Sequence, residues 1–186
     1  MSLLLAPTYR MTVEKYEELG RTGFFAPDER VELLNGEIVV MSPIGYRHAT
    51  AVKRLTNFLA RNSRGRFDVN PQNPFNLDEY SQPQPDLTLL NPACDGSGDH
   101  PEPADIFLVI EVSDSTVPYD RNNKGPAYAA QGLREFWLLN LNKNRLEVFR
   151  DPQPEGYREQ LTFGPEEKVA PLAFPDLPVR VGDFLP

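Results

Sequence analysis

The pattern of apolar and polar residues predicts its clearest helix over residues 46–62. Apolar residues recur there at helical spacing and form one stripe, into which His48 also falls. We therefore expect the helix to bury this stripe, with His48 facing inward. Three arginines spaced seven residues apart lie about a third of a turn away and form an outward basic ridge. The stripe consists of Val52, Leu55 and Leu59, and the ridge consists of Arg47, Arg54 and Arg61.

Capping residues and a proline predict two shorter helices. Thr12 caps a helix over residues 12–19, and Gly20 ends it. Pro126 fits only the first turn of a helix, because proline lacks a backbone N–H and its ring clashes with the preceding turn. The second short helix is therefore expected over residues 123–131, and it should begin no earlier than Asn122.

Strand-forming runs bounded by turn residues predict two β-hairpins and several further strands. The first hairpin covers residues 30–41 and turns at Asn35-Gly36, a dipeptide typical of tight hairpin turns. The second hairpin joins residues 135–141 to residues 145–150. The sequence also predicts an extended region at 67–77, strands at 87–90 and 106–112, and short strands between proline-rich turns near the C-terminus.

These elements predict an α/β or α+β fold, with a curved, mixed β-sheet flanked by helices and carrying the β-hairpins. The length of 186 residues fits one domain with its own core, expected over residues 11–186. Residues 1–10 are expected to form an N-terminal arm. Residues 91–105 form a long polar connection, and connections of this length are usually functional or disordered.

Composition and charge narrow the class of protein. The formal net charge of −8 argues against a surface that attracts nucleic acid everywhere, but residues 47–66 contain six Lys or Arg and no Asp or Glu. Cys94 is the single cysteine, so no disulfide within the chain, zinc knuckle or thiol protease is predicted. No apolar stretch reaches the length of a membrane span and no secretion signal is recognisable. We therefore expect a cytoplasmic protein without a membrane partner.

A single carboxylate, Glu111, interrupts the apolar run of the predicted strand at 106–112. A buried carboxylate must be paired, hydrogen-bonded or bound to a metal, because an unpaired buried ion is strongly destabilising. A second acid, Asp86, stands at the start of the strand at 87–90. Carboxylates on neighbouring strands with an amine nearby suit a hard divalent cation and a water held beside it.

Each acid also has an ordinary structural interpretation. Asp86 fits a turn aspartate after Pro85, and Glu111 fits a buried ion pair with Arg121 or Arg134. For either acid alone the ordinary interpretation is favoured. For both acids together with a nearby lysine, the metal site is favoured.

Several short motifs occur in a fixed order along the chain. They are Glu32-Leu33-Leu34-Asn35-Gly36-Glu37, Ser42-Pro43, His48, Pro85-Asp86, Glu111-Val112-Ser113, Asp120, Lys124, Tyr128 and Glu135-Phe136-Trp137-Leu138-Leu139. This ordered set resembles the Uma-two family of PD-(D/E)XK restriction-endonuclease-like proteins. The resemblance covers nearly the whole chain from Thr12 onward, and it implies a restriction-endonuclease-like core with a metal-dependent nuclease site.

The resemblance implies roles for particular residues. Asp86, Glu111 and the Val112 carbonyl would hold Mg²⁺ or Mn²⁺. In the common form of the motif a lysine stands two residues after the glutamate, where this chain has Ser113. Lys124 matches the lysine that the family uses instead, and it would help to orient and deprotonate the attacking water. Because Ser113 shares the strand face of Glu111, we expect the Lys124 amine to lie above it.

One departure from the family pattern, Gly125-Pro126, follows Lys124 directly. It places Lys124 at the N-terminus of the predicted helix, where the dipole disfavours a positive charge. That position either helps to lower the pKa of Lys124 or displaces the lysine from the site. Ser113, Glu32 and His48 are secondary candidates: Glu32 fits the same cavity or a half-exposed strand edge, and His48 fits the site or a hydrogen-bonded core position.

These residues predict a metal-dependent endonuclease that hydrolyses phosphodiester bonds in DNA. Arg47, Arg54 and Arg61 are the candidates to contact the DNA backbone. The alternative is a non-enzymatic nucleic-acid-binding or regulatory module with a weakened nuclease site, which the acidic net charge, Ser113 and Gly125-Pro126 favour. A metal-dependent hydrolase with another substrate is a third interpretation. A homodimer is left open.

Overall fold

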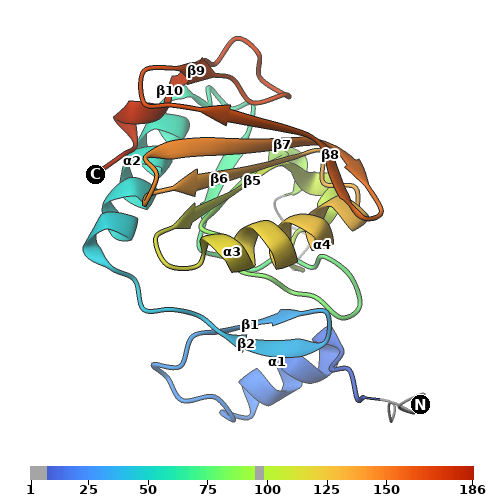
Figure 1. The fold of residues 1–186 in the computed structure, drawn as a ribbon. Helices are drawn as coiled ribbons and strands as arrows, with labels where there is room; N and C mark the ends of the chain where they lie inside the picture. Colours follow the sequence, from blue (N-terminus) through green and yellow to red (C-terminus); the bar gives the residue numbers. More distant parts are fainter. Residues whose placement is uncertain (1–7, 95–98) are drawn as a thin grey trace, which may run out of the picture.

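The computed structural model of the chain describes residues 8–94 and 99–186. A six-stranded sheet lies at its centre (Figure 1). All neighbouring strands are antiparallel except the third and fourth, which are parallel. In spatial order the strands are β3 (Asp68–Pro71), β4 (Leu87–Leu90), β5 (Ile106–Ser113), β6 (Glu135–Asn140), β7 (Arg145–Gln153) and β8 (Gly156–Phe163).

One face of the sheet is covered by the long helix α2 (Tyr46–Asn62). Its predicted apolar stripe is buried, and Leu55 and Leu59 pack in one cluster with Leu108 and Ile110 of β5. The period of 3.6 residues that defines the stripe in the sequence therefore corresponds to the face that meets the sheet.

A continuous helical segment covers the opposite face and connects the parallel strands β5 and β6. It consists of α3 (Val117–Tyr119), the π-helical turn η3 (Asp120–Lys124) and α4 (Gly125–Ala130). Tyr128 of α4 is fully buried and packs in a second cluster with Val109 of β5. A crossover helix of this kind is what two parallel neighbouring strands require.

The N-terminal part of the chain forms a small layer beside this helical segment (Figure 1). It contains α1 (Val13–Arg21) and the hairpin of β1 (Val31–Leu34) and β2 (Glu37–Val40). Asn35 and Gly36 have φ angles of 54° and 81°, as a tight hairpin turn with left-handed central residues requires.

Short elements complete the described chain. Near the C-terminus, β9 (Lys168–Val169) pairs with β10 (Val179–Arg180), and η4 (Val181–Asp183) follows. The long polar connection contains η1 (Pro92–Cys94) and η2 (Pro103–Asp105). Residues 95–98 of that connection and residues 1–7 of the expected N-terminal arm lie outside the described residues.

The predicted mixed sheet flanked by helices is confirmed, together with both hairpins. The boundaries of α2 and β4 coincide with the predicted ranges 46–62 and 87–90. The C-terminal region differs, because β8 is a full strand of eight residues that extends the second hairpin into a three-stranded meander.

The predicted end of the first helix is wrong. Gly20 lies within α1, which continues to Arg21 and has Thr22 as its C-cap. Thr12 caps the helix at its start as expected, by accepting the N–H of Lys15. The left-handed conformation belongs to Gly23, directly after the C-cap, with φ of 74°, so the glycine at the C-terminus of the helix is Gly23 and not Gly20.

The predicted start of the crossover helix is also wrong. The helical segment begins at Val117, well before Pro126. The π-helical turn directly before the proline explains this, because the N–H of Gly125 bonds to the carbonyl of Asp120, five residues earlier. The wider turn allows the helix to continue through Pro126, which has no backbone N–H to donate.

From Leu108 onward the residues of β5 alternate between the two faces of the sheet, but Phe107 departs from this alternation. Leu89 pairs with Leu108 whereas Leu90 pairs with Ile106, so Phe107 is the extra residue of a β-bulge. Phe107 therefore packs with the cluster on the α2 side, away from the face that carries Glu111.

Candidate active site

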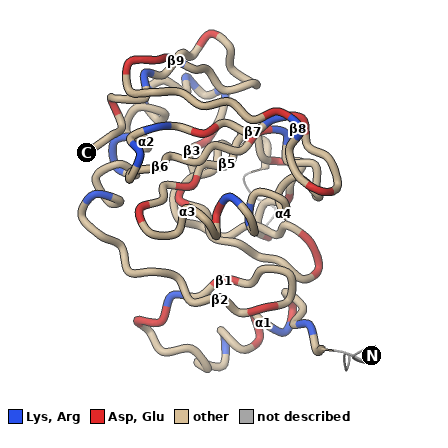
Figure 2. Tube along the Cα trace, in the orientation of Figure 1, with Lys and Arg blue, Asp and Glu red and all other residues tan. Residues whose placement is uncertain are grey.

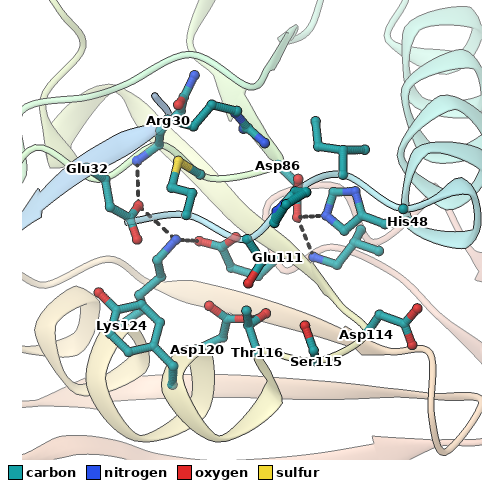
Figure 3. A pocket seen from close by; sticks show the side chains of 18 of the residues that line it. Arg30, Glu32, His48, Asp86, Glu111, Asp114, Ser115, Thr116, Asp120 and Lys124 are labelled. Atoms are coloured by element: carbon teal, nitrogen blue, oxygen red, sulfur yellow. Dashed lines mark hydrogen bonds and ion pairs between the residues drawn. The ribbon is translucent and has the colours of Figure 1, made fainter. Parts of the chain in front are cut away.

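A cavity of about 830 Å³ opens beside the ends of β4 and β5. The end of β2 and the connection from β2 to α2, together residues 39–45, form one wall, and residues of α3 and η3 form the other (Figure 3). Acidic side chains outnumber basic ones around it. The acids are Glu32, Asp86, Glu111, Asp114 and Asp120, and the bases are Arg30, His48 and Lys124.

Asp86 directly precedes Leu87, the first residue of β4. Regular pairing of β4 with β5 stops at Leu87 and Ile110. Just beyond it, the Asp86 carboxylate accepts the backbone N–H of Val112 at 2.8 Å and lies 3.0 Å from Nε2 of His48. The carboxylate thus replaces a strand partner for Val112 and connects β5 to α2 through His48.

His48 is on the inward side of α2, as its place in the apolar stripe predicts, and its side chain is 18% exposed. Burial alone lowers the pKa of His48, but the hydrogen bond and negative charge of Asp86 outweigh burial and raise it. The imidazole is therefore protonated more readily than an ordinary histidine. Its position fits both interpretations considered from the sequence, because it is hydrogen-bonded and lines the cavity.

Lys124 reaches the cavity from the last position of η3. Its Nζ lies 3.0 Å from Oε1 of Glu111 and 2.9 Å from Oε2 of Glu32 (Figure 3). Each of the three side chains is at most 5% exposed. Glu32 Oε2 also accepts the backbone N–H of Gln84 at 3.0 Å. One ammonium group is therefore buried between carboxylates from β1 and β5.

The carboxylates around Lys124 determine the direction in which its pKa is shifted. Burial alone lowers the pKa of Lys124, but Glu111 and Glu32 more than offset it, so the pKa is raised above the ordinary lysine value. The expectation of a lowered pKa at a helix N-terminus is wrong, because a full helical turn and more precedes Lys124. Lys124 keeps its proton in this arrangement and acts as a fixed positive charge.

Glu111 has further partners that the sequence did not reveal. The hydroxyl of Tyr128, which the sequence identified only as part of the ordered motifs, donates to Glu111 Oε1 at 2.8 Å. Burial raises the pKa of Glu111 and Lys124 lowers it, while the nearby carboxylates of Asp120 and Asp86 raise it further. The net shift is upward. Glu111 thus sits in a region where negative charge is already concentrated.

Asp120 is a site residue to which the sequence assigned no function beyond its place in a motif. It is 4% exposed and accepts hydrogen bonds from the hydroxyls of Ser113 and, at 2.7 Å, Thr116. Burial raises its pKa, and Lys124 opposes that shift. Ser113 therefore contacts Asp120, whereas the Lys124 amine contacts Glu111. The spacing of four residues between Asp120 and Lys124, which places both on one helical face, is the signal that could have identified Asp120.

The oxygen donors at the cavity fit a hard divalent cation. Asp86, Glu111 and Val112 line it together, and carboxylate and carbonyl oxygens are the donors that Mg²⁺ and Mn²⁺ prefer. Burial is the main cause of the raised pKa of both Glu111 and Asp120, and nearby carboxylates raise it further, so a bound cation would favour the ionised form of these groups. Within residues 8–94 and 99–186, no group of three His, Cys, Asp or Glu side chains has the geometry of a metal site. A cation would therefore need the smaller set of two carboxylates and the Val112 carbonyl.

Lys and Arg residues recur along α2 (Figure 2), and the three arginines of the basic ridge are exposed. Arg47 pairs with Asp114 at 3.1 Å and donates to a backbone carbonyl at 2.7 Å. Arg54 donates to the carbonyl of Leu185. Arg61 is also exposed. Two of the three arginines therefore have structural partners as well as access to solvent.

The structural interpretation of Glu111 as an arginine partner is wrong. Arg121 donates to the buried Glu147 on β7 through two contacts of 2.8 Å. Arg134 is exposed. The cation that Glu111 contacts is the lysine that the family resemblance singled out, at 3.0 Å.

The sequence pattern of the Uma2 family, described as "Putative restriction endonuclease", matches residues 13–182. The chain belongs to this family. The matched range contains every residue of the cavity, including the carboxylates and Lys124. Membership of the Uma2 family indicates a restriction-endonuclease-like nuclease, in agreement with the order of the motifs.

The fold also resembles a solved structure. A crystal structure of a "putative nuclease" from Anabaena variabilis aligns with a TM-score of 0.73 and 13% sequence identity, over 94% of this chain and 97% of that chain. At this identity the similarity shows a common fold only. No curated protein matches the Uma2-family chain described here. In the described part of the chain no helix has the length and apolar character needed to cross a bilayer.

Proposed function

We propose that this Uma2-family chain is a Mg²⁺- or Mn²⁺-dependent endonuclease that hydrolyses phosphodiester bonds in DNA. The observation that carries the proposal is the buried contact of Lys124 with Glu111 inside a cavity that Asp86 also lines. A lysine beside two strand-end carboxylates is the arrangement expected of a nuclease site. A purely structural ion pair between Lys124 and Glu111 would not explain why Asp86 and a cavity lie beside it.

The electrostatics of the cavity support the need for a cation. A phosphate group entering a space lined by five carboxylates would meet like charge, and Lys124 is already paired with two of them. Asp86, Glu111 and the Val112 carbonyl are the groups that would hold the metal. A bound divalent cation supplies an activated water and offsets the charge on the phosphate.

The side chains of the cavity then have distinct functions. Lys124 contacts Glu111 and Glu32, so its ammonium group would orient the attacking water and stabilise negative charge. Glu32 and Tyr128 hold Lys124 and Glu111 in position through contacts of 2.9 and 2.8 Å. His48 orients the Asp86 carboxylate from α2.

The decisive experiment compares cleavage of supercoiled plasmid DNA by the wild type and by Glu111→Ala, with Mg²⁺, with Mn²⁺ and with a chelator. We expect cleavage only for the wild type with metal. Glu159→Ala, which removes an exposed glutamate on β8, is the matched control and should cleave normally. Single-stranded DNA and RNA are tested in parallel, because cleavage of RNA alone would correct the substrate class.

A second readout separates metal binding from cleavage. Mn²⁺ should raise the melting temperature of the wild type, and Asp86→Asn and Glu111→Gln should each lose most of that increase. Equal shifts in all three proteins would contradict the proposed ligands. Nucleic-acid binding without cleavage in either metal would instead support the non-enzymatic module considered from the sequence.

A further inference from the structure

Two buried polar atoms of the described side chains, in residues 8–94 and 99–186, have no hydrogen-bond partner. They are Nδ1 of His48 and the hydroxyl oxygen of Tyr119. Both residues line the same cavity. Leaving such an atom unpaired is unfavourable for folding, so native proteins retain few of them, and those retained call for an explanation such as function.

Tyr119 is held by its ring and not by its hydroxyl. It lies at the end of α3, directly before Asp120, and its ring packs against the buried cluster around Val109 and Tyr128. The hydroxyl is thereby fixed in place without a protein group to bond to. This is the reverse of an ordinary buried tyrosine, whose hydroxyl usually finds a partner.

The surroundings of Tyr119 determine how its hydroxyl can act. Burial raises the pKa of Tyr119, and the negative charge of Glu32 raises it further. The phenol therefore keeps its proton at neutral and alkaline pH and remains a hydrogen-bond donor. The cationic donor nearby, Lys124, is already occupied by two carboxylates, so Tyr119 supplies a neutral donor with no assigned acceptor.

We propose that Tyr119 is a substrate-binding residue whose hydroxyl donates a hydrogen bond to an oxygen of the phosphate that is cleaved. The proposal rests on the proposed nuclease function and names a contact beyond the carboxylates and lysine. Phosphate oxygens are strong acceptors, and a neutral donor among carboxylates can meet them without first breaking an ion pair. A phosphate oxygen would thereby give this hydroxyl the acceptor that no described protein group provides.

The test is the variant Tyr119→Phe, which removes the hydroxyl and keeps the ring. We expect the rate of metal-dependent cleavage to fall about tenfold or more, because a hydrogen bond to a charged group is lost. We expect the melting temperature of the free protein to stay equal or to rise, because no hydrogen bond is lost in that state. Lower activity without lower stability is the pattern that distinguishes a substrate contact from a structural role.

The matched control is Tyr157→Phe. The Tyr157 hydroxyl donates to the carbonyl of Leu133 at 2.8 Å, and Tyr157 is not among the cavity residues. This variant should lower the melting temperature and leave the cleavage rate unchanged, the opposite of Tyr119→Phe. The pair of variants thus compares the same chemical change at a satisfied and at an unsatisfied hydroxyl.

The outcomes distinguish a wrong assignment of Tyr119 from a wrong assignment of the nuclease function. A Tyr119→Phe protein that cleaves like the wild type, or that melts at a lower temperature, overturns the assignment of Tyr119 and leaves the nuclease function intact. A wild type that cleaves no nucleic acid with either metal overturns the nuclease function, and the assignment of Tyr119 with it.

Discussion

Lys124 shows how single residues depend on one another in this site. Its ammonium lies between Glu111 and Glu32, and all three side chains are nearly inaccessible to water. Removing one member of a buried ion cluster costs more than its hydrogen bonds, since the remaining charges stay buried without compensation. The carboxylates would then have to be protonated or to find another cation.

We predict that Lys124→Met lowers the free energy of unfolding by about 3 kcal/mol at neutral pH, since it leaves buried carboxylates unpaired. Divalent metal should then stabilise this variant more than it stabilises the wild type, because the missing positive charge no longer competes with the cation. Urea denaturation with and without Mn²⁺ measures both effects. Metal-dependent cleavage should be lost.

The control is Lys53→Met on the exposed side of α2, which should change the unfolding free energy by no more than about 0.5 kcal/mol. Identical effects of the two substitutions would show that the charge of Lys124 is not needed to balance the cavity carboxylates.

At the scale of elements, η3 is the part of the fold that organises the site. Its charged residues all bond to groups outside the turn. Asp120 accepts from Ser113 of β5, Lys124 contacts Glu111 of β5, and Arg121 donates to Glu147 of β7. The π-helical turn is therefore attached to two strands of the sheet, which holds its side chains against the cavity.

The contact of Arg121 with Glu147 should make the stability of the fold depend on pH. Burial alone raises the pKa of Glu147, but hydrogen bonds from Arg121, Arg145 and Asn140 outweigh it and lower the pKa. A lowered pKa in the folded state means that ionised Glu147 stabilises the fold above the ordinary pKa near 4.5. That stabilisation is lost as the pH falls through the folded-state pKa.

We therefore predict that Glu147→Gln lowers the free energy of unfolding by about 2 kcal/mol at pH 7, the size expected for charge-assisted hydrogen bonds. The difference from the wild type should shrink as the pH falls below the ordinary pKa near 4.5 and through the lowered folded-state pKa, because the wild-type carboxyl is then protonated as well. Chemical denaturation across this pH range measures it. Glu159→Gln, at an exposed position on β8, should show neither the loss nor its pH dependence, and a constant difference for Glu147→Gln would contradict the argument.

At the scale of the whole molecule, charge is distributed unevenly. The net charge is −8 and the cavity is acidic, whereas Lys and Arg gather along and just after α2 (Figure 2). A DNA backbone that reaches the cavity would be attracted to the α2 side and repelled elsewhere. Arg47 also holds Asp114, so its replacement would disturb the cavity wall as well as the ridge.

We predict that Arg54→Ala combined with Arg61→Ala weakens DNA binding and reduces the slope of log affinity against log salt concentration by about two units, one for each lost phosphate contact. Fluorescence anisotropy over a series of salt concentrations measures the slope, with Ca²⁺ in place of Mg²⁺. Arg21→Ala combined with Arg158→Ala, at exposed positions away from α2, should leave it unchanged. The same slope in all three proteins would show that the ridge is only a solvated helix face.

Features that depend on neighbours along the chain were determined by the sequence itself. The apolar stripe of α2, the Asn35-Gly36 turn and the carboxylate within β5 follow from periodicity, turn chemistry and the cost of burying a charge. The order of the motifs added the family and identified Lys124 as a residue of the same site as Glu111. These predictions hold because each rests on a few adjacent residues or on a pattern that repeats at short range.

The remaining features were decided only by the tertiary structure. Gly125-Pro126 predicts a helix start, yet contacts of Asp120 and Lys124 with β5 stabilise a π-helical turn that carries the helix past the proline. The raised pKa of Lys124 depends on Glu111 and also on Glu32, which lies in another strand far away in the sequence. The Tyr119 hydroxyl is unpaired because no described protein group from the surrounding segments is positioned to form a hydrogen bond with it. Such features are set by distances between remote segments, and no local propensity records those distances.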